Sequence, residues 1–142
     1  MCEQSPIVAA LLDDALQRAA QDTEIGNWVT ARMKLTFSDS LAALRQLPKE
    51  SLPDVIYIDP MYPRSKRSAK VKKEIRALQQ LLGPDQNSVE LFNCSLRSAH
   101  KRVVVKRPRW ADPLHARNPN TSVQSKNTRY DIYFTLAGSE NS

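Results

Sequence analysis

The segment Asp59-Pro60-Met61-Tyr62-Pro63 combines residue types that can hold a planar base carrying an exocyclic amine. The Asp59 carboxylate and the Pro60 carbonyl can both accept hydrogen bonds from an NH2 group, and the ring of Tyr62 offers a face on which the base stacks. Such a nitrogen is a weak nucleophile, so the chemistry required is orientation toward a methyl donor rather than strong general-base catalysis. The alternative is an ordinary Asp-Pro turn after a strand, and the segment alone leaves both open.

A basic run follows this turn directly and favours the first interpretation. It contains Arg64, Lys66, Arg67, Lys70, Lys72 and Lys73. Charge runs are usually solvated helix faces, but cations at the lip of a base site can hold the phosphates that flank a flipped-out nucleotide. A second basic group includes Lys106 and Arg107, for which we predict the same role. Trp110 lies beside it and is suited equally to stacking and to packing under a loop.

Acidic residues also follow two earlier predicted strands. Glu3 and the run Ser38-Asp39-Ser40 stand where those strands end. In a doubly wound sheet, ligands bind at the carboxyl ends of the strands, where one acid can accept the ribose hydroxyls of an adenosine and the next can accept from its adenine amine. Both acids could instead cap the helices that follow them, and that alternative stays open.

The elements that must position these residues alternate between helix and strand. Helical patterns cover residues 7–19, 25–32, 41–47, 71–82 and 88–99, and strand patterns cover 34–37, 54–58, 102–105, 122–126 and 130–136. The run Val55-Ile56-Tyr57-Ile58 is nearly all apolar, as expected for a parallel strand covered on both faces. We therefore predict one α/β domain over residues 1–142, with a doubly wound, mostly parallel, Rossmann-like sheet and an antiparallel edge hairpin.

Composition narrows the class of protein. The 142 residues are 41% hydrophobic and carry a formal charge of +6, which favours a polyanionic partner such as nucleic acid. The two cysteines, Cys2 and Cys94, lie far apart and outside any zinc spacing, while His100 and His115 are isolated, so we predict no metal site. No export signal or membrane-length apolar run is present in the sequence, and we predict a cytoplasmic location without a membrane partner.

The glycines are too few for a complete α/β domain that binds a nucleotide-like cofactor. Gly26, Gly83 and Gly138 are the three in the chain, and none lies in a Gly-rich turn after a strand. Such a turn lets the backbone approach a cofactor closely. We therefore expect this sequence to be the C-terminal portion of a longer protein, without the first strand and its Gly-rich cofactor loop.

Several long stretches together resemble the family of ribosomal small subunit methyltransferase J, which methylates the N2 amine of a guanosine in bacterial 16S ribosomal RNA. The similar stretches are residues 3–14, Ile56 to Pro63, Lys66 with 68–74, Leu82 to Asp85, Lys101 to Pro108 and Arg129 to Tyr133. The resemblance implies an enzyme that transfers a methyl group from S-adenosylmethionine to guanine N2 in 16S ribosomal RNA or the small ribosomal subunit.

The resemblance also implies which residues contact the cofactor. These are Glu3 with Gln4, Asp39 with Ser40, and Asp59, although Gln4 and Asp39 replace an expected Arg and Ser. It implies that the basic run contacts RNA, whereas the assignment of Asp59, Pro60 and Tyr62 to the target base rests on their residue types. Two alternatives stay open: an adenine-N6 methyltransferase, because an Asp-Pro-x-Tyr turn serves either amine, and a truncated, non-catalytic RNA-binding module.

Overall fold

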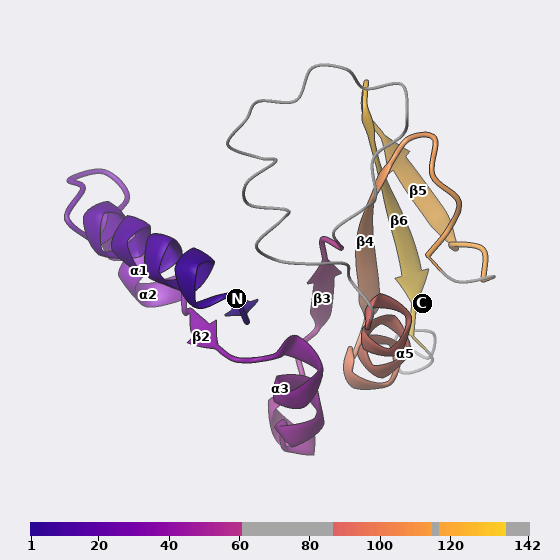
Figure 1. The fold of residues 1–142 in the computed structure, drawn as a ribbon, viewed down its shortest axis with the longest axis horizontal. Helices are drawn as coiled ribbons and strands as arrows, with labels where there is room; N and C mark the ends of the chain where they lie inside the picture. The colour runs from indigo at the N-terminus through magenta and orange to yellow at the C-terminus, as the bar shows by residue number, and fades with distance from the viewer. Residues whose placement is uncertain (61–86, 115–116, 136–142) are drawn as a thin grey trace. The chain divides into compact units, whose positions relative to one another are not determined.

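The computed structural model describes residues 1–60, 87–114 and 117–135, which are drawn in colour in Figure 1. The chain divides into two compact units, Met1–Gln46 and Leu47–Ser142, and each contains both helices and strands. Within the described ranges, no helix combines the length and apolar character needed to cross a membrane.

The first unit holds a short parallel pair of strands and three helices. Strand β1 (Cys2–Glu3) pairs with β2 (Thr36–Phe37), and helices α1 (Pro6–Ala20) and α2 (Gly26–Arg32) connect them. Helix α3 (Ser40–Gln46) follows β2. The predicted start of α1 is confirmed: the Ser5 hydroxyl accepts from the Val8 amide, and Pro6 opens the helix.

Helices α1 and α2 meet at a position that requires glycine. A Cβ atom at Gly26 would lie 2.4 Å from the carbonyl oxygen of Ala20, closer than van der Waals contact permits. Any larger residue would therefore force the start of α2 away from the end of α1.

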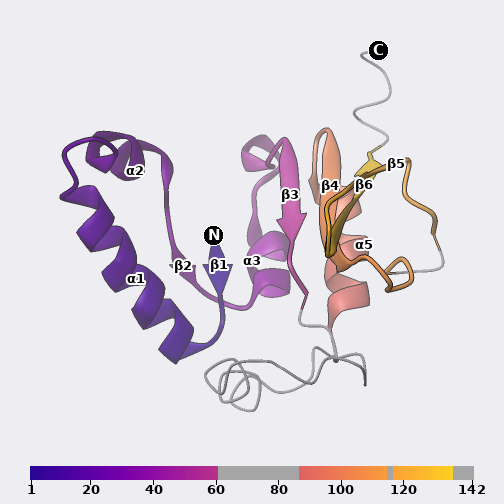
Figure 2. The ribbon, with the colours of Figure 1, turned by 90° about the horizontal axis from the view of Figure 1, so that it is seen from above.

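The second unit contains a four-stranded mixed sheet in the order β3-β4-β6-β5 (Figure 2). A short 3-10 helix, η1 (Lys49–Ser51), precedes β3, and helix α5 (Ser88–Ser98) precedes β4. The strands are β3 (Val55–Ile58), β4 (Arg102–Pro108), β5 (Thr121–Gln124) and β6 (Thr128–Phe134). The predicted helix at 88–99 and the antiparallel hairpin at the sheet edge are both confirmed, with small shifts in their ends.

The core of this unit lies on one face of the sheet, against α5. Val103, Val105 and Tyr133 are completely buried, and the ring of Phe92 from α5 meets the Tyr133 ring edge-on at a centroid distance of 4.7 Å. The prediction that β3 is covered on both faces is wrong for this structure, because Tyr57 is 53% exposed whereas Ile58 is buried. Neighbouring residues of a strand point to opposite faces, and among the described residues of this unit the packed core lies on the α5 face.

The α/β class is confirmed, but the four-stranded sheet is not mostly parallel. Strands β3 and β4 run parallel, whereas β4 with β6 and β6 with β5 run antiparallel. The segment Lys106-Arg107-Pro108, expected to follow its strand, lies inside β4. The physical reason is that β6 continues the ladder of hydrogen-bonded neighbours as far as Pro108 opposite Thr128.

Candidate functional site

Asp59 stands immediately after β3, and its carboxylate is bound by a lysine of the neighbouring strand. The parallel register places Ile58 opposite Val105, so the next residues along, Asp59 and Lys106, are also neighbours. The Lys106 Nζ donates to Asp59 Oδ2 over 2.8 Å, and the two side chains are 39% and 49% exposed. The pair is therefore open to solvent and to a ligand.

Two tyrosines act electrostatically on this pair. The hydrogen bond to Asp59 is the main cause that raises the pKa of Lys106, which Tyr57 and Tyr130 also raise. Burial raises the pKa of Tyr57, and the neighbouring Asp59 carboxylate raises it further. Lys106 was predicted to contact RNA, and the structure instead gives its ammonium a carboxylate partner that was itself predicted to hold the target base.

The other residues of the predicted base site are only partly covered by the structure. Pro60 lies within the described residues and is buried. Outside the described residues lie Tyr62 and the basic positions Arg64, Lys66, Arg67, Lys70, Lys72 and Lys73.

In the first unit, the structure brings Glu3 and Asp39 to the same edge of a sheet. Strands β1 and β2 are parallel, with Glu3 opposite Phe37, and Asp39 follows two residues later. Each carboxylate also holds local backbone: Glu3 Oε1 accepts from the Ser5 amide over 2.7 Å, and Asp39 Oδ1 accepts from the Ala42 amide over 2.8 Å. The helix-capping role that the sequence left open for Asp39 is therefore confirmed.

These backbone hydrogen bonds do not exclude a ligand role for the two acids. Each bond uses one carboxylate oxygen, so the second oxygen of Glu3 and of Asp39 can still accept from a hydroxyl or an amine. Gln4 is exposed after Glu3, and Ser40 is half-buried at the start of α3. These donors and acceptors fit the polar edge of an adenosine. A hollow of about 330 Å³ in this unit, lined by residues of α1 and β2, includes none of the four.

Arg107 is placed differently from its prediction as an RNA contact. It is only 7% exposed, and its guanidinium donates to the carbonyl oxygen of Asp112. A buried cation that binds a backbone carbonyl holds the chain in place and is not presented to a phosphate. The correction arises because Arg107 lies on the packed face of β4, one residue beyond the Lys106 position that faces the other way.

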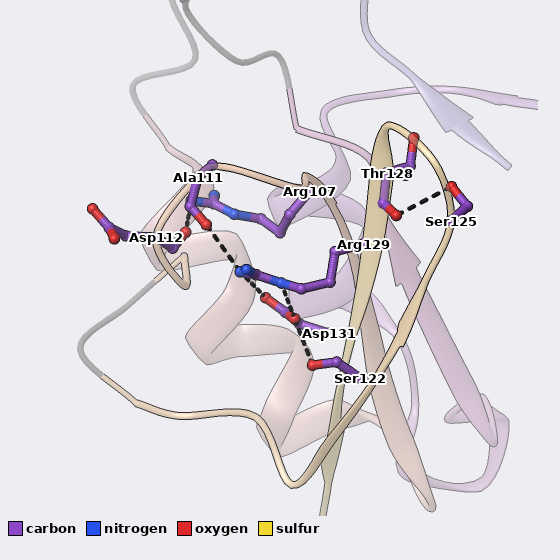
Figure 3. Close-up of polar contacts among 8 residues, drawn as sticks. All are labelled: Arg107, Ala111, Asp112, Ser122, Ser125, Thr128, Arg129 and Asp131. Atoms are coloured by element: carbon purple, nitrogen blue, oxygen red, sulfur yellow. Dashed lines mark hydrogen bonds and ion pairs between the residues drawn. The ribbon is translucent and has the colours of Figure 1, made fainter.

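The sequence interpretation missed a polar cluster on the same face, shown in Figure 3. Asp131 is completely buried and accepts from Arg129 Nε over 2.6 Å, from a terminal nitrogen of Arg129 over 2.9 Å, and from the Ser122 hydroxyl over 2.9 Å. The same terminal nitrogen of Arg129 donates to the Ala111 carbonyl oxygen over 3.0 Å. The cluster therefore ties β5 and β6 to the segment that follows β4.

A signal for this cluster was present in the sequence. Arg129 and Asp131 are two residues apart in a strand, and hence on one face, and Tyr133 continues that face. Opposite charges on the same face as a core aromatic indicate a buried pair. The prediction treated this segment only as a strand.

Comparisons with known proteins show which family the chain resembles. A family model described as "Putative SAM-dependent methyltransferase" matches residues 1–135. The "Ribosomal RNA small subunit methyltransferase J" of Photobacterium profundum is 49% identical over 140 residues, which are 96% of this chain and 55% of that protein. The protein of the same name from Aeromonas salmonicida is 48% identical over 137 residues, 96% of this chain and 54% of its own length.

Solved structures include a similar protein. The SAM-dependent methyltransferase of Neisseria gonorrhoeae superposes with a TM-score of 0.73 at 34% identity, over 95% of this chain and 51% of that one. The chain spans about half the length of the curated relatives it matches. Because the family model covers nearly all of the sequence, the chain belongs to the family of S-adenosylmethionine-dependent methyltransferases.

Proposed function

We propose that this protein takes part in methyl transfer from S-adenosylmethionine to the exocyclic N2 amine of a guanosine in small-subunit ribosomal RNA. The observation that carries the proposal is the Asp59 carboxylate at the end of β3, half-exposed and with one oxygen bound by Lys106, in a chain 49% identical to a methyltransferase J. Asp59, Pro60 and Tyr62 form the base side of the site. Glu3, Gln4, Asp39, Ser40 and also Asp59 are the residues proposed to contact S-adenosylmethionine.

The role of Asp59 follows from its hydrogen bonds. Lys106 occupies Oδ2, so Oδ1 can accept one N–H of the target amine, and the Pro60 carbonyl accepts the other. Two accepted hydrogen bonds orient the nitrogen lone pair toward the methyl carbon that S-adenosylmethionine supplies. The Asp59 carboxylate lies where it can also offset positive charge that develops on the methylated nitrogen.

The partner and setting of the protein belong to the same proposal. The charge of +6 supports a polyanionic substrate, and we propose that the basic residues from Arg64 to Lys73, as well as Lys106, contact 16S ribosomal RNA or the small ribosomal subunit. A ribosomal substrate implies a cytoplasmic location. We also propose that both units belong to one doubly wound, Rossmann-like methyltransferase domain, a proposal supported by the similarity to the Neisseria gonorrhoeae structure.

The first experiment tests the transferred group and its acceptor. The chain is incubated with labelled S-adenosylmethionine and small ribosomal subunits, beside a fusion that adds the upstream portion of the Photobacterium profundum relative. Label is expected on guanosine and absent when inosine, which lacks the N2 amine, replaces the target nucleotide. Label that persists on inosine would contradict the guanine-N2 assignment, and label on adenosine would support the adenine-N6 alternative.

The second experiment separates an enzyme from a non-catalytic RNA-binding module. Calorimetry with S-adenosylmethionine on the chain and on the fusion measures cofactor affinity directly. Binding by either form, weakened by Asp39→Ala, supports the cofactor side of the site. Salt-sensitive RNA binding by both forms without any cofactor heat would favour the module.

A further inference from the structure

Trp110 is a large aromatic side chain that the structure leaves in solvent. Its exposed fraction is 62%. An exposed indole is costly to hydrate and is a common device for binding unpaired nucleobases, because every base has a face that can stack on it. The sequence alone did not distinguish this role from packing under a loop, and no loop of the described residues buries the Trp110 side chain.

The turn that carries Trp110 is held rigidly at its base. The Ala111 amide donates to the Pro108 carbonyl over 3.0 Å, which closes a turn with Arg109 and Trp110 at its tip. The Arg109 amide donates to the Asn127 carbonyl over 3.2 Å, so the turn is also fastened to the β5–β6 hairpin.

Two guanidinium groups, one buried and one partly buried, fasten the other side of the turn (Figure 3). Arg129 donates to the Ala111 carbonyl, and Arg107 donates to the Asp112 carbonyl. Ala111 itself is buried. The backbone on either side of Trp110 is therefore fixed while its side chain is exposed, so stacking costs little ordering entropy.

The position of the turn relates Trp110 to Asp59. Asp59 follows the carboxyl end of β3, and Trp110 follows the carboxyl end of β4. These two strands are parallel neighbours. Trp110 is four residues beyond Lys106, which at about 3.3 Å per residue places its backbone within about 13 Å of the lysine that binds Asp59. That separation suits a nucleotide next to the target, not the target base itself. The exposed Arg109 adds a cation for the phosphate.

We propose that Trp110 is a stacking platform for an unpaired base of single-stranded RNA beside the nucleotide held at Asp59. This stacking proposal rests on the proposed RNA substrate, but measurements of RNA binding test it without any assay of methyl transfer. The chain has two tryptophans, and the other, Trp28 of α2, is also exposed, at 56%. Trp28 therefore serves as a matched control for both fluorescence and affinity.

Fluorescence tests the contact directly. The Trp28→Phe variant, in which Trp110 is the remaining tryptophan, should be quenched when a single-stranded oligoribonucleotide is added, because bases that stack on indole quench its emission. The Trp110→Phe variant, which reports on Trp28, should change little. Quenching of Trp28 alone, or of neither tryptophan, would overturn the proposal.

Affinity tests the energetic contribution. Trp110→Ala should weaken binding of the same oligoribonucleotide by about 5- to 150-fold, the range typical of one stacked base. Trp110→Phe should recover part of the loss, and Trp28→Ala should change affinity less than twofold, or by under ~0.4 kcal/mol. The slope of affinity against salt should be unchanged in Trp110→Ala, since no phosphate contact is lost.

The outcomes separate this proposal from the proposed methyl transfer. If RNA affinity is the same with and without the Trp110 side chain, the stacking proposal is wrong. The proposed methyl transfer is not affected by that result, because the labelling assay tests it separately. Loss of affinity for a fully duplexed RNA as large as that for the single strand would mean that Trp110 does not bind an unpaired base. Absence of RNA binding by the parent chain would overturn the platform as well.

Discussion

Two carboxylate–cation pairs in the second unit differ in burial. Asp59 and Lys106 are about half and two fifths exposed, whereas Asp131 is fully buried and Arg129 is only 17% exposed. The exposed pair has solvent on one side, and Asp59 retains a second oxygen for a ligand. The buried pair has its acceptors occupied by Arg129 and Ser122.

The difference shows how the same chemical groups take different roles. A buried charge must be fully paired, since removal of one partner leaves the other without solvation. An exposed pair contributes little to stability and can exchange partners with a substrate. We therefore infer that Arg129 and Asp131 maintain the fold around the turn at Trp110, and that Asp59 and Lys106 are available for chemistry.

The largest expected effect is the loss of the buried pair. Asp131→Ala should lower the free energy of unfolding by about 3–5 kcal/mol, because the Arg129 guanidinium would stay buried without its carboxylate. Urea denaturation followed by circular dichroism measures the change. A loss below about 1 kcal/mol would show that the buried pair behaves like an exposed one.

The next effect concerns activity rather than stability. Asp59→Ala should reduce methyl transfer by about 10²-fold or more, since the target amine loses its orienting acceptor, in whichever form of the protein is active in the labelling assay. The matched control is Asp54→Ala. Asp54 binds Lys101 over 2.9 Å at the opposite end of the same two strands.

Stability should distinguish the two variants from Asp131→Ala. Both exposed pairs are open to solvent, so each alanine substitution should lower the unfolding free energy far less than Asp131→Ala does. Equal methyl transfer by Asp59→Ala and Asp54→Ala would remove Asp59 from the mechanism.

A smaller effect is expected at the cap of α3. Asp39→Ala should lower unfolding free energy by about 1 kcal/mol through loss of the bond to the Ala42 amide, while Asp39→Ser should retain it. If Asp39 also binds the cofactor, Asp39→Ala should weaken S-adenosylmethionine binding in calorimetry. Unchanged stability in Asp39→Ala would mean that the cap contributes nothing.

The smallest effect concerns pH. The pKa of Lys106 is raised above its ordinary value of 10.5, mainly by the bond to Asp59. A raised folded-state pKa stabilises the fold fully below that ordinary value, and the contribution is lost as pH rises through the folded-state pKa. Parent and Lys106→Met should therefore differ by under about 1 kcal/mol near neutral pH and converge at strongly alkaline pH. A difference that grows with alkaline pH would contradict this assignment.

Local features of the sequence were enough to predict much of the second unit and the start of the first. Ser5 with Pro6 marks the first turn of α1, and the placement of Asp59 after an apolar strand follows from residue type alone. Partners across strands were not predictable in this way. The bond between Lys106 and Asp59 joins residues 47 positions apart, and it depends on the register of β3 against β4.

The sequence by itself therefore determined the helices and most strands of the described residues, the basic character and the acids at strand ends, because these depend on spacing and residue type within a few positions. The helix predicted over residues 71–82 lies outside the described residues. Tertiary structure decided that Arg107 is buried, that Lys106 binds Asp59 and that Trp110 is exposed. The physical reason is that these outcomes depend on contacts between distant segments. The pairing of β6 with β4 beyond the predicted strand end places Arg107 on the packed face, and the register of β3 against β4 brings Lys106 to Asp59.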